Sequence, residues 1–254
     1  MFTSHSRQRS SLFLASTVEM YHETGFVVLK LFDESQVGML EKFARDWVYR
    51  LLAPWTADRE HQFPLKTYHI WSQSLSIDHG SIFCAQNRHT CPCTEVEKTL
   101  INGRLKSFLH QIGLEQYRIW DEGLGWLAFR FIRPGAGDGY PLSRKEWGVA
   151  RNVVSCWVPV IGYSPRETLA LVPGSHLREY EKCLPTDDKF CRGEYRLSPI
   201  YADLELYRPQ LERGEVVIYH PRMLHSEDVA VSEVTRLNLE FRIEPLPPPT
   251  QEHA

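Results

Sequence analysis

Two residues near the C-terminal end of the sequence, His225 and Arg236, have side chains suited to binding a metal ion and a carboxylate. A neutral imidazole is the commonest protein ligand for metals, and the planar guanidinium of arginine binds a carboxylate through two parallel hydrogen bonds. The two residues lie eleven positions apart. A plainer interpretation stays open, because a histidine at a strand end is usually structural and Arg236 could pair with Glu233 or Glu240.

A second polar stretch, Gly137-Asp-Gly-Tyr-Pro-Leu-Ser-Arg-Lys-Glu-Trp147, gathers acidic, basic and aromatic residues. Its carboxylates, Asp138 and Glu146, are candidate metal ligands. Tyr140 and Lys145 are candidate acid–base groups, since a phenol and an amine can both exchange protons with a substrate. The alternative is that the two adjacent basic residues are ordinary solvated charges of a loop.

A third cluster, His89-Thr-Cys-Pro-Cys93, offers three ligands of the kind that zinc prefers. A fourth ligand would have to come from elsewhere, and no Cys-x-x-Cys pair supports the site. We therefore expect Cys91 and Cys93 to be ordinary reduced thiols. The sequence also contains no Ser-His-Asp nucleophile elbow, no phosphate-binding glycine loop and no dinucleotide fingerprint.

The N-terminal half of the chain predicts helices that must pack on a sheet. Gly25 precedes a short β-branched strand that ends at Lys30, and Asp33 with Gln36 has capping-box spacing. Apolar residues then recur at helical intervals, which predicts an amphipathic helix over 34–52 that Pro54 ends. A second helical pattern covers about 95–112.

From Tyr117 onward the pattern changes to short strands separated by glycine, proline and aspartate. The predicted strands are Trp126–Ile132, Val153–Val160, Leu169–Val172, Glu215–Tyr219 and Arg236–Ile243. Strands at irregular spacing with such breaks favour a sandwich or jelly-roll barrel over a parallel sheet. The fold class is thus mainly β with flanking helices.

The bulk composition restricts the classes of partner and compartment. The chain has 254 residues and a formal net charge of -3, which argues against a general nucleic-acid binder. We expect a flexible N-terminus over 1–16, one domain over 17–244 and a disordered tail over 245–254. The absence of a signal peptide, of a long apolar run and of framework-spaced cysteines predicts a cytoplasmic protein without membrane contact.

Four segments, in order, resemble the phytanoyl-CoA dioxygenase family. They are Gly25-Phe-Val-Val28; Trp157-Val-Pro-Val160 with Thr168-Leu-Ala-Leu-Val-Pro-Gly-Ser-His176; Gly214-Glu-Val-Val-Ile-Tyr-His-Pro-Arg-Met-Leu-His225; and Thr235-Arg-Leu-Asn-Leu-Glu-Phe-Arg242. Their order and the step from His225 to Arg236 are more specific than any one segment. The resemblance implies a double-stranded β-helix (jelly-roll, cupin-like) barrel.

The resemblance also implies cofactors, Fe(II) and 2-oxoglutarate, and roles for individual residues. In the family, the residue matching His225 is the distal ligand of a two-histidine, one-carboxylate iron site. The residue matching Arg236 binds the far carboxylate of 2-oxoglutarate. His176 and His220 are expected to be structural, although His220 could serve as a substitute donor to the pocket.

The sequence departs from the family pattern at the other half of the iron site. A His-x-Asp or His-x-Glu pair is expected shortly before Val160, but the chain has no histidine between His110 and His176. The flanking residues place Ser143-Arg-Lys145 at this position, and a shifted alignment places Gly139-Tyr-Pro there. One consequence is that the Lys145 ammonium could lie at the vacated metal position and attract an acidic ligand.

Three functions remain open at this point. The first is an atypical Fe(II)/2-oxoglutarate-dependent oxygenase that oxidises a small-molecule substrate. The second is a non-catalytic descendant, either a ligand-binding barrel or the partner subunit of an active relative in a homo- or hetero-oligomer. The third is metal-free chemistry in a rebuilt pocket, with Lys145, Tyr140 or Glu146 as acid or base.

Overall fold

The computed structural model describes most of the chain between residues 16 and 246. The described ranges are 16–56, 62–80, 88–89, 94–120, 127–136, 138, 140–147, 152–164, 167–184, 195–201, 203–227 and 233–246. The predicted flexible N-terminus falls almost wholly outside these ranges, as does the predicted tail beyond Leu246.

The larger of two main sheets is antiparallel and carries the strands that position the candidate residues. Its strands follow the order β1-β10-β6-β12-β4-β2, and β3 also pairs with β12. The bounds are β1 Phe26–Lys30, β2 Arg88–His89, β3 Tyr117–Ile119, β4 Leu127–Ile132, β6 Val154–Ile161, β10 Glu215–Tyr219 and β12 Arg236–Pro245. All five strands predicted after Tyr117 are present, four of them in this sheet.

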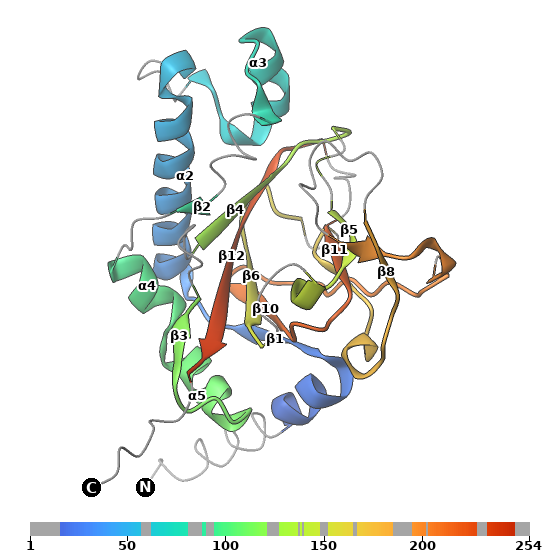
Figure 1. Cartoon of the computed structure of the whole chain (residues 1–254). Coiled ribbons are helices and arrows are strands. Elements are labelled where there is room, and N and C mark those ends of the chain that lie inside the picture. Colours follow the sequence, from blue (N-terminus) through green and yellow to red (C-terminus); the bar gives the residue numbers. More distant parts are fainter. Residues whose placement is uncertain are drawn as a thin grey trace, which may run out of the picture.

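A smaller sheet has the order β5-β11-β7, and β8 pairs with β9 in a separate ribbon. The bounds are β5 Tyr140–Ser143, β7 Ala170–Leu171, β8 Lys182–Cys183, β9 Arg196–Leu197 and β11 His225–Glu227. Figure 1 shows β5 and β11 set apart from the long strand β12. Among the described residues the strands thus form separate antiparallel sheets, as in a jelly roll, and not one closed barrel.

Helices cover the outer face of the large sheet, as predicted. In Figure 1 helix α2 (Glu34–Thr56) runs along one side of it. The capping box is present, because Asp33 and Gln36 exchange hydrogen bonds from backbone nitrogen to side-chain oxygen at 2.9–3.0 Å. The predicted stop at Pro54 is wrong: the helix includes Pro54 and ends at Thr56. Trp47 stacks on Phe129 of β4 with ring centroids 3.8 Å apart.

The second predicted helix is two helices. They are α4 (Thr94–Leu100) and α5 (Gly103–Gln111). Asn102 divides them, because its side chain accepts hydrogen bonds from the backbone nitrogens of Arg104 and Leu105 and so caps α5. A further helix, α3 (Tyr68–Ser74), was not predicted. Short 3-10 helices lie at Leu65–Thr67, Lys145–Trp147, Ser175–Leu177 and Pro199–Tyr201. No helix among the described residues is long and apolar enough to cross a membrane.

Strand β12 has one apolar face and one polar face. Side chains alternate between the two faces of a strand. One set, Leu237, Leu239, Phe241 and Ile243, belongs to the main apolar core together with residues of α2, α4 and α5. The other set, Arg236, Asn238, Glu240 and Arg242, is polar, and its last three members are buried as well. The face of β12 away from the helices therefore presents charge to a water-poor interior.

Candidate functional site

His225 is held in the orientation expected of a metal ligand. It is 3% exposed at the start of β11, and its ring centroid lies 4.8 Å from that of Tyr219. Its Nδ1 lies 3.0 Å from the Met223 carbonyl oxygen, so Nδ1 donates and Nε2 carries the lone pair. Nε2 is buried and has no hydrogen-bond partner among the described residues. Burial and the nearby Lys145 ammonium lower the pKa of this imidazole to about 3.

The group beside His225 is an ammonium. Lys145 is 8% exposed, and its Nζ lies 2.9 and 3.1 Å from the two carboxylate oxygens of Glu240 on β12. Arg242 donates to the same carboxylate at 3.0 and 3.2 Å. Burial by itself would raise the pKa of Glu240, but Lys145, Arg242 and Arg130 hold it well below its usual range. The interpretation of Lys145 as a solvated loop charge is therefore wrong.

Ser143 faces His225 directly across the β5–β11 pair. Directly opposite residues of an antiparallel pair lie on the same face, with Cβ atoms about 4.5–5.5 Å apart. The alignment of Ser143-Arg-Lys145 with the family's His-x-Asp pair thus agrees with this geometry. At these positions the chain has a hydroxyl and an ammonium.

Arg144, between these two positions, is turned away from them into a separate contact. Its side chain is 0% exposed and donates to the carbonyl oxygens of Ser175 and Arg178 at 2.6 and 2.5 Å. The solvated-loop interpretation is wrong for this residue too. The carboxylate of Glu146 pairs with Arg144 at 3.1 Å and lies 3.6 Å from Arg222. Glu146 is therefore committed to this arginine pair.

Asp138 belongs to another ion pair. Its two carboxylate oxygens accept from Arg133 at 2.8 Å each, and His79 lies 3.8 Å away. Arg133 lowers the pKa of Asp138 against the effect of burial. Among the described residues, no three histidine, cysteine, aspartate or glutamate side chains are grouped closely enough to hold a metal ion. The structure thus does not bring Asp138 or Glu146 together with His225.

Two further sequence candidates are only partly described. The backbone of Tyr140 pairs with Glu227 in the β5–β11 register, and its side chain lies outside the described part. The backbone of His89 forms β2, whereas Cys91 and Cys93 lie outside the described residues. The zinc hypothesis therefore stays a prediction.

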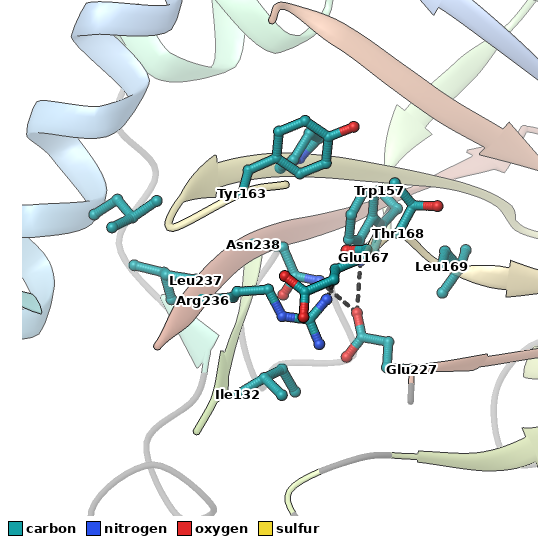
Figure 2. Close-up of a pocket in the computed structure, with 12 residues that line it drawn as sticks. Ile132, Trp157, Tyr163, Glu167, Thr168, Leu169, Glu227, Arg236, Leu237 and Asn238 are labelled. Atoms are coloured by element: carbon teal, nitrogen blue, oxygen red, sulfur yellow. Dashed lines mark hydrogen bonds between the residues drawn. The ribbon is translucent and has the colours of Figure 1, made fainter. Parts of the chain in front are cut away.

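Arg236 lines a small cavity of about 20 Å³ between β6, β12 and the segment before β7. Its Nη1 donates to the Glu167 carbonyl oxygen at 2.6 Å. The remaining lining residues combine apolar walls with a few polar groups, as ligand pockets do: Ile132, Trp157, Pro159, Ile161, Tyr163, Glu167, Thr168, Leu169, Glu227, Leu237 and Asn238. Figure 2 shows the Arg236 guanidinium in this cavity, close to Glu167 and Glu227.

Sequence reasoning missed Glu227 and Asn238. It named Glu240 only as a possible partner of Arg236, whereas Glu240 pairs with Lys145 and Arg242. One Glu227 oxygen accepts from Trp157 Nε1 at 2.5 Å and from the side-chain amide of Asn238. The available signal was the alternation of polar and apolar residues in Arg236–Arg242. Such a pattern usually marks a solvent-facing strand, and it did not by itself indicate a buried polar face.

His176 and His220 lie outside this cavity and contact each other with ring centroids 5.2 Å apart. His176 Nε2 bonds the His22 carbonyl oxygen at 2.9 Å, and His220 Nδ1 accepts from the Arg222 nitrogen at 3.1 Å. Both residues therefore connect backbone segments. Burial, with His176 and Arg222 nearby, lowers the pKa of His220 to about 4.

This shift predicts acid sensitivity with a defined sign. An unfolded histidine has a pKa near 6.5, so the stability that neutral His220 contributes is present above pH 6.5 and is lost as the pH falls toward 4. Each extra proton bound by the unfolded state changes the free energy of unfolding by about 1.4 kcal/mol per pH unit. In urea titrations between pH 6 and 4.5, His220→Asn, whose amide oxygen can replace Nδ1, should flatten this slope by about that amount. The exposed His110→Gln serves as control, and equal slopes in all three proteins would contradict the assignment.

Comparison with known proteins settles the ancestry of this arrangement. The model of the phytanoyl-CoA dioxygenase (PhyH) family matches residues 21–233, which is most of the chain. The chain belongs to the phytanoyl-CoA dioxygenase family. A search of curated proteins finds no match.

Solved structures of this kind share the fold at low sequence identity. The non-heme alpha ketoglutarate dependent carbocyclase SnoK from nogalamycin biosynthesis has a TM-score of 0.57 at 14% identity, over 90% of this chain and 82% of its own. EctD from S. alaskensis, solved with 2-oxoglutarate and 5-hydroxyectoine, has a TM-score of 0.57 at 13% identity. This match covers 91% of this chain and 75% of EctD. EvdMO1 has a TM-score of 0.56 at 16% identity. The match covers 91% of this chain but only 49% of EvdMO1. These similarities confirm the mainly antiparallel jelly-roll fold.

The family implies iron, and the residues of this chain do not fit it. His225 supplies one imidazole with a suitable lone pair. The two positions that should supply the second imidazole and the carboxylate hold Ser143 and Lys145. An ammonium has no lone pair to donate, and its charge repels a divalent cation.

Proposed function

We propose that this protein is a small-molecule-binding member of the phytanoyl-CoA dioxygenase family that works without iron. In this proposal the cavity beside Arg236 holds the carboxylate of a small organic ligand. The internal ion pair of Lys145 with Glu240 takes the place of the metal. The family resemblance makes 2-oxoglutarate the first candidate ligand.

The proposal depends on one observation: Lys145 is buried beside His225 and contacts Glu240. The pair is 8% and 3% exposed, so neither charge has water as an alternative partner. The carboxylate itself is shared with Arg242, which leaves a compact group of cations around one anion. A divalent ion at His225 would have to displace or face this ammonium, at a cost in Coulomb energy that low dielectric makes large.

Arg236 supports the ligand-binding half of the proposal. It is the residue that the resemblance assigns to the 2-oxoglutarate carboxylate, and its guanidinium lines the cavity. The planar guanidinium of an arginine can bind a carboxylate through two parallel hydrogen bonds. Tryptophan, isoleucine and leucine side chains form the apolar walls around it.

A second candidate function, the family's Fe(II)/2-oxoglutarate-dependent oxidation of a small molecule, is favoured by the geometry of His225 alone. A ligating histidine typically donates its other ring nitrogen to a carbonyl oxygen, as His225 does to Met223. Bound iron would supply oxygen activation. The acid–base alternative through Lys145, Tyr140 or Glu146 has less support, because ion pairs hold Lys145 and Glu146.

The ligand-binding proposal predicts iron-independent binding of a small carboxylate at Arg236. The melting temperature of the wild-type protein should rise with millimolar 2-oxoglutarate or glutarate, and Mn²⁺ should not enlarge the shift. Arg236→Lys keeps the charge but loses the bidentate fork, so binding should weaken at least tenfold, or about 1.4 kcal/mol.

Arg118→Lys is the matched control, because Arg118 is 64% exposed on β3 and pairs with Glu244. It should leave binding unchanged. Absence of any shift with carboxylates in the wild type, with and without metal, would contradict the proposal. Succinate formation that depends on iron and on His225 would instead support the second candidate.

A further inference from the structure

A helix over residues 16–24, which precedes β1, packs beside two adjacent histidines, His176 and His220. His176 Nε2 lies 2.9 Å from the His22 carbonyl oxygen, and the His220 ring centroid lies 6.2 Å from that of Tyr21. Burial raises the pKa of Tyr21, so the phenol is neutral at and below pH 7. The two histidine rings lie 5.2 Å apart. The helix is thus docked on a pair of imidazoles that the candidate site does not use.

Backbone hydrogen bonds fix the end of this helix against the same two segments. The Gly174 nitrogen donates to the Thr24 carbonyl oxygen, and the His220 nitrogen donates to the Gly25 carbonyl oxygen, both at 2.8 Å. Gly25 has a φ of 86°, and a Cβ added there would lie 2.5 Å from His176 Nδ1. Helix and imidazoles are therefore in close contact.

Hydrogen bonds hold both imidazoles in a neutral tautomer. His176 Nε2 donates to the carbonyl oxygen, so the lone pair is on Nδ1, which is buried with no hydrogen-bond partner among the described residues. His220 Nδ1 accepts from the Arg222 backbone nitrogen at 3.1 Å, so its lone pair is also on Nδ1. A second proton would enter each ring at Nδ1. It would have no acceptor at His176, and at His220 it would meet an N–H group.

The charged groups around the pair also oppose a second proton. Arg144 and Arg222 lie near both imidazoles, as does His22 of the helix itself. Glu146 does not offset these cations, because it pairs with Arg144 at 3.1 Å and lies 3.6 Å from Arg222, and Glu179 pairs with Arg222 as well. Burial lowers the pKa of both imidazoles, and the two arginines lower it further.

We propose that His176 and His220 form a proton-sensitive latch that holds the helix over residues 16–24 in place at neutral pH and loosens it in acid. A histidine exposed by opening titrates near pH 6.5, so docking is strongest above that pH. Docking weakens as the pH falls toward 4, where His220 takes up a proton in place. In this window each proton bound on opening raises the opening constant about tenfold per pH unit. The latch does not depend on which ligand binds beside Arg236.

Hydrogen exchange of the full chain, measured by mass spectrometry between pH 7 and 4.5, tests the latch. The double variant His176→Gln/His220→Asn keeps an amide nitrogen for the His22 carbonyl oxygen and an amide oxygen for the Arg222 nitrogen, but neither amide takes up a proton. Comparing proteins at the same pH cancels the intrinsic change in exchange rate. From pH 6.5 to 4.5, residues 16–25 of the wild type should lose at least tenfold more protection than those of the double variant. His110→Gln, at an exposed position, is the control and should behave like the wild type.

The exchange of β12 shows whether the opening is local. We expect residues 16–25 to be less protected than β12 at every pH, because local opening costs less free energy than global unfolding. Equal protection of the two segments would overturn the latch, since the helix would then leave only when the whole protein unfolds. Equal pH dependence in the wild type and the double variant would overturn it too. If the double variant does not fold, the wild type decides: after correction for the intrinsic rate, protection of residues 16–25 that does not change with pH would end the proposal.

Discussion

Replacing Lys145 by methionine should lower the free energy of unfolding by about 3 kcal/mol, because removing one partner of a buried ion pair leaves a charge in low dielectric. For a chain of this size the melting temperature should fall by roughly 6–12 °C. Glu240 keeps Arg242 as a partner, which limits the loss. The double variant Lys145→Met/Glu240→Gln should be no more stable than Lys145→Met, since it leaves the buried Arg242 guanidinium without its carboxylate partner.

The exposed ion pair Lys42–Asp46 on α2 provides the control. Its side chains are 74% and 52% exposed, and exposed pairs contribute little to stability. Lys42→Met should therefore change the melting temperature only slightly. If Lys145→Met were equally mild in chemical and thermal unfolding, Lys145 would be a solvated residue and the ion-pair account of the site would fail.

Rebuilding the metal site should convert this chain into a metal-binding protein. The double variant Ser143→His/Lys145→Asp places an imidazole opposite His225 and replaces the ammonium at position 145 by a carboxylate. Without metal this variant should be less stable than the wild type, because Asp at 145 faces Glu240. Mn²⁺, which accepts nitrogen and oxygen ligands, should bind at least 100-fold more tightly than to the wild type, or by about 2.7 kcal/mol.

Two comparisons make the rebuilt site specific to His225. Ser143→His alone should bind Mn²⁺ weakly, because the ammonium remains. Adding His225→Ala to the double variant should abolish the gain in affinity and the metal-dependent rise in melting temperature. If Mn²⁺ did not change the melting temperature of the double variant, Ser143 and Lys145 would not face His225.

Local sequence patterns predicted the fold well because the strands and helices have regular periods. The capping box at Asp33 and the strand at Glu215–Tyr219 were located at their observed positions. The errors have local causes. Pro54 is accommodated inside α2 near its C-terminal end, and Asn102 caps a new helix where a continuous one was expected.

The site was harder to predict because its decisive contacts join residues far apart in sequence. Lys145 and Glu240 are 95 positions apart, and Trp157 and Glu227 are 70 apart. The family motif located Arg236 and His225 but did not indicate that Glu240, two positions from Asn238 on the same face of β12, pairs with Lys145. The burial of this polar face becomes visible only in the structure, where Asn238, Glu240 and Arg242 are at most 7% exposed.

The iron content of the wild-type protein tests the central claim most directly. The full chain would be purified without oxygen, incubated with excess Fe(II) and passed through a gel-filtration column beside the rebuilt Ser143→His/Lys145→Asp variant. We expect far less than one iron per wild-type chain and close to one per rebuilt chain. One iron retained per wild-type chain, and lost in His225→Ala, would contradict the claim that the Lys145–Glu240 ion pair has replaced the metal.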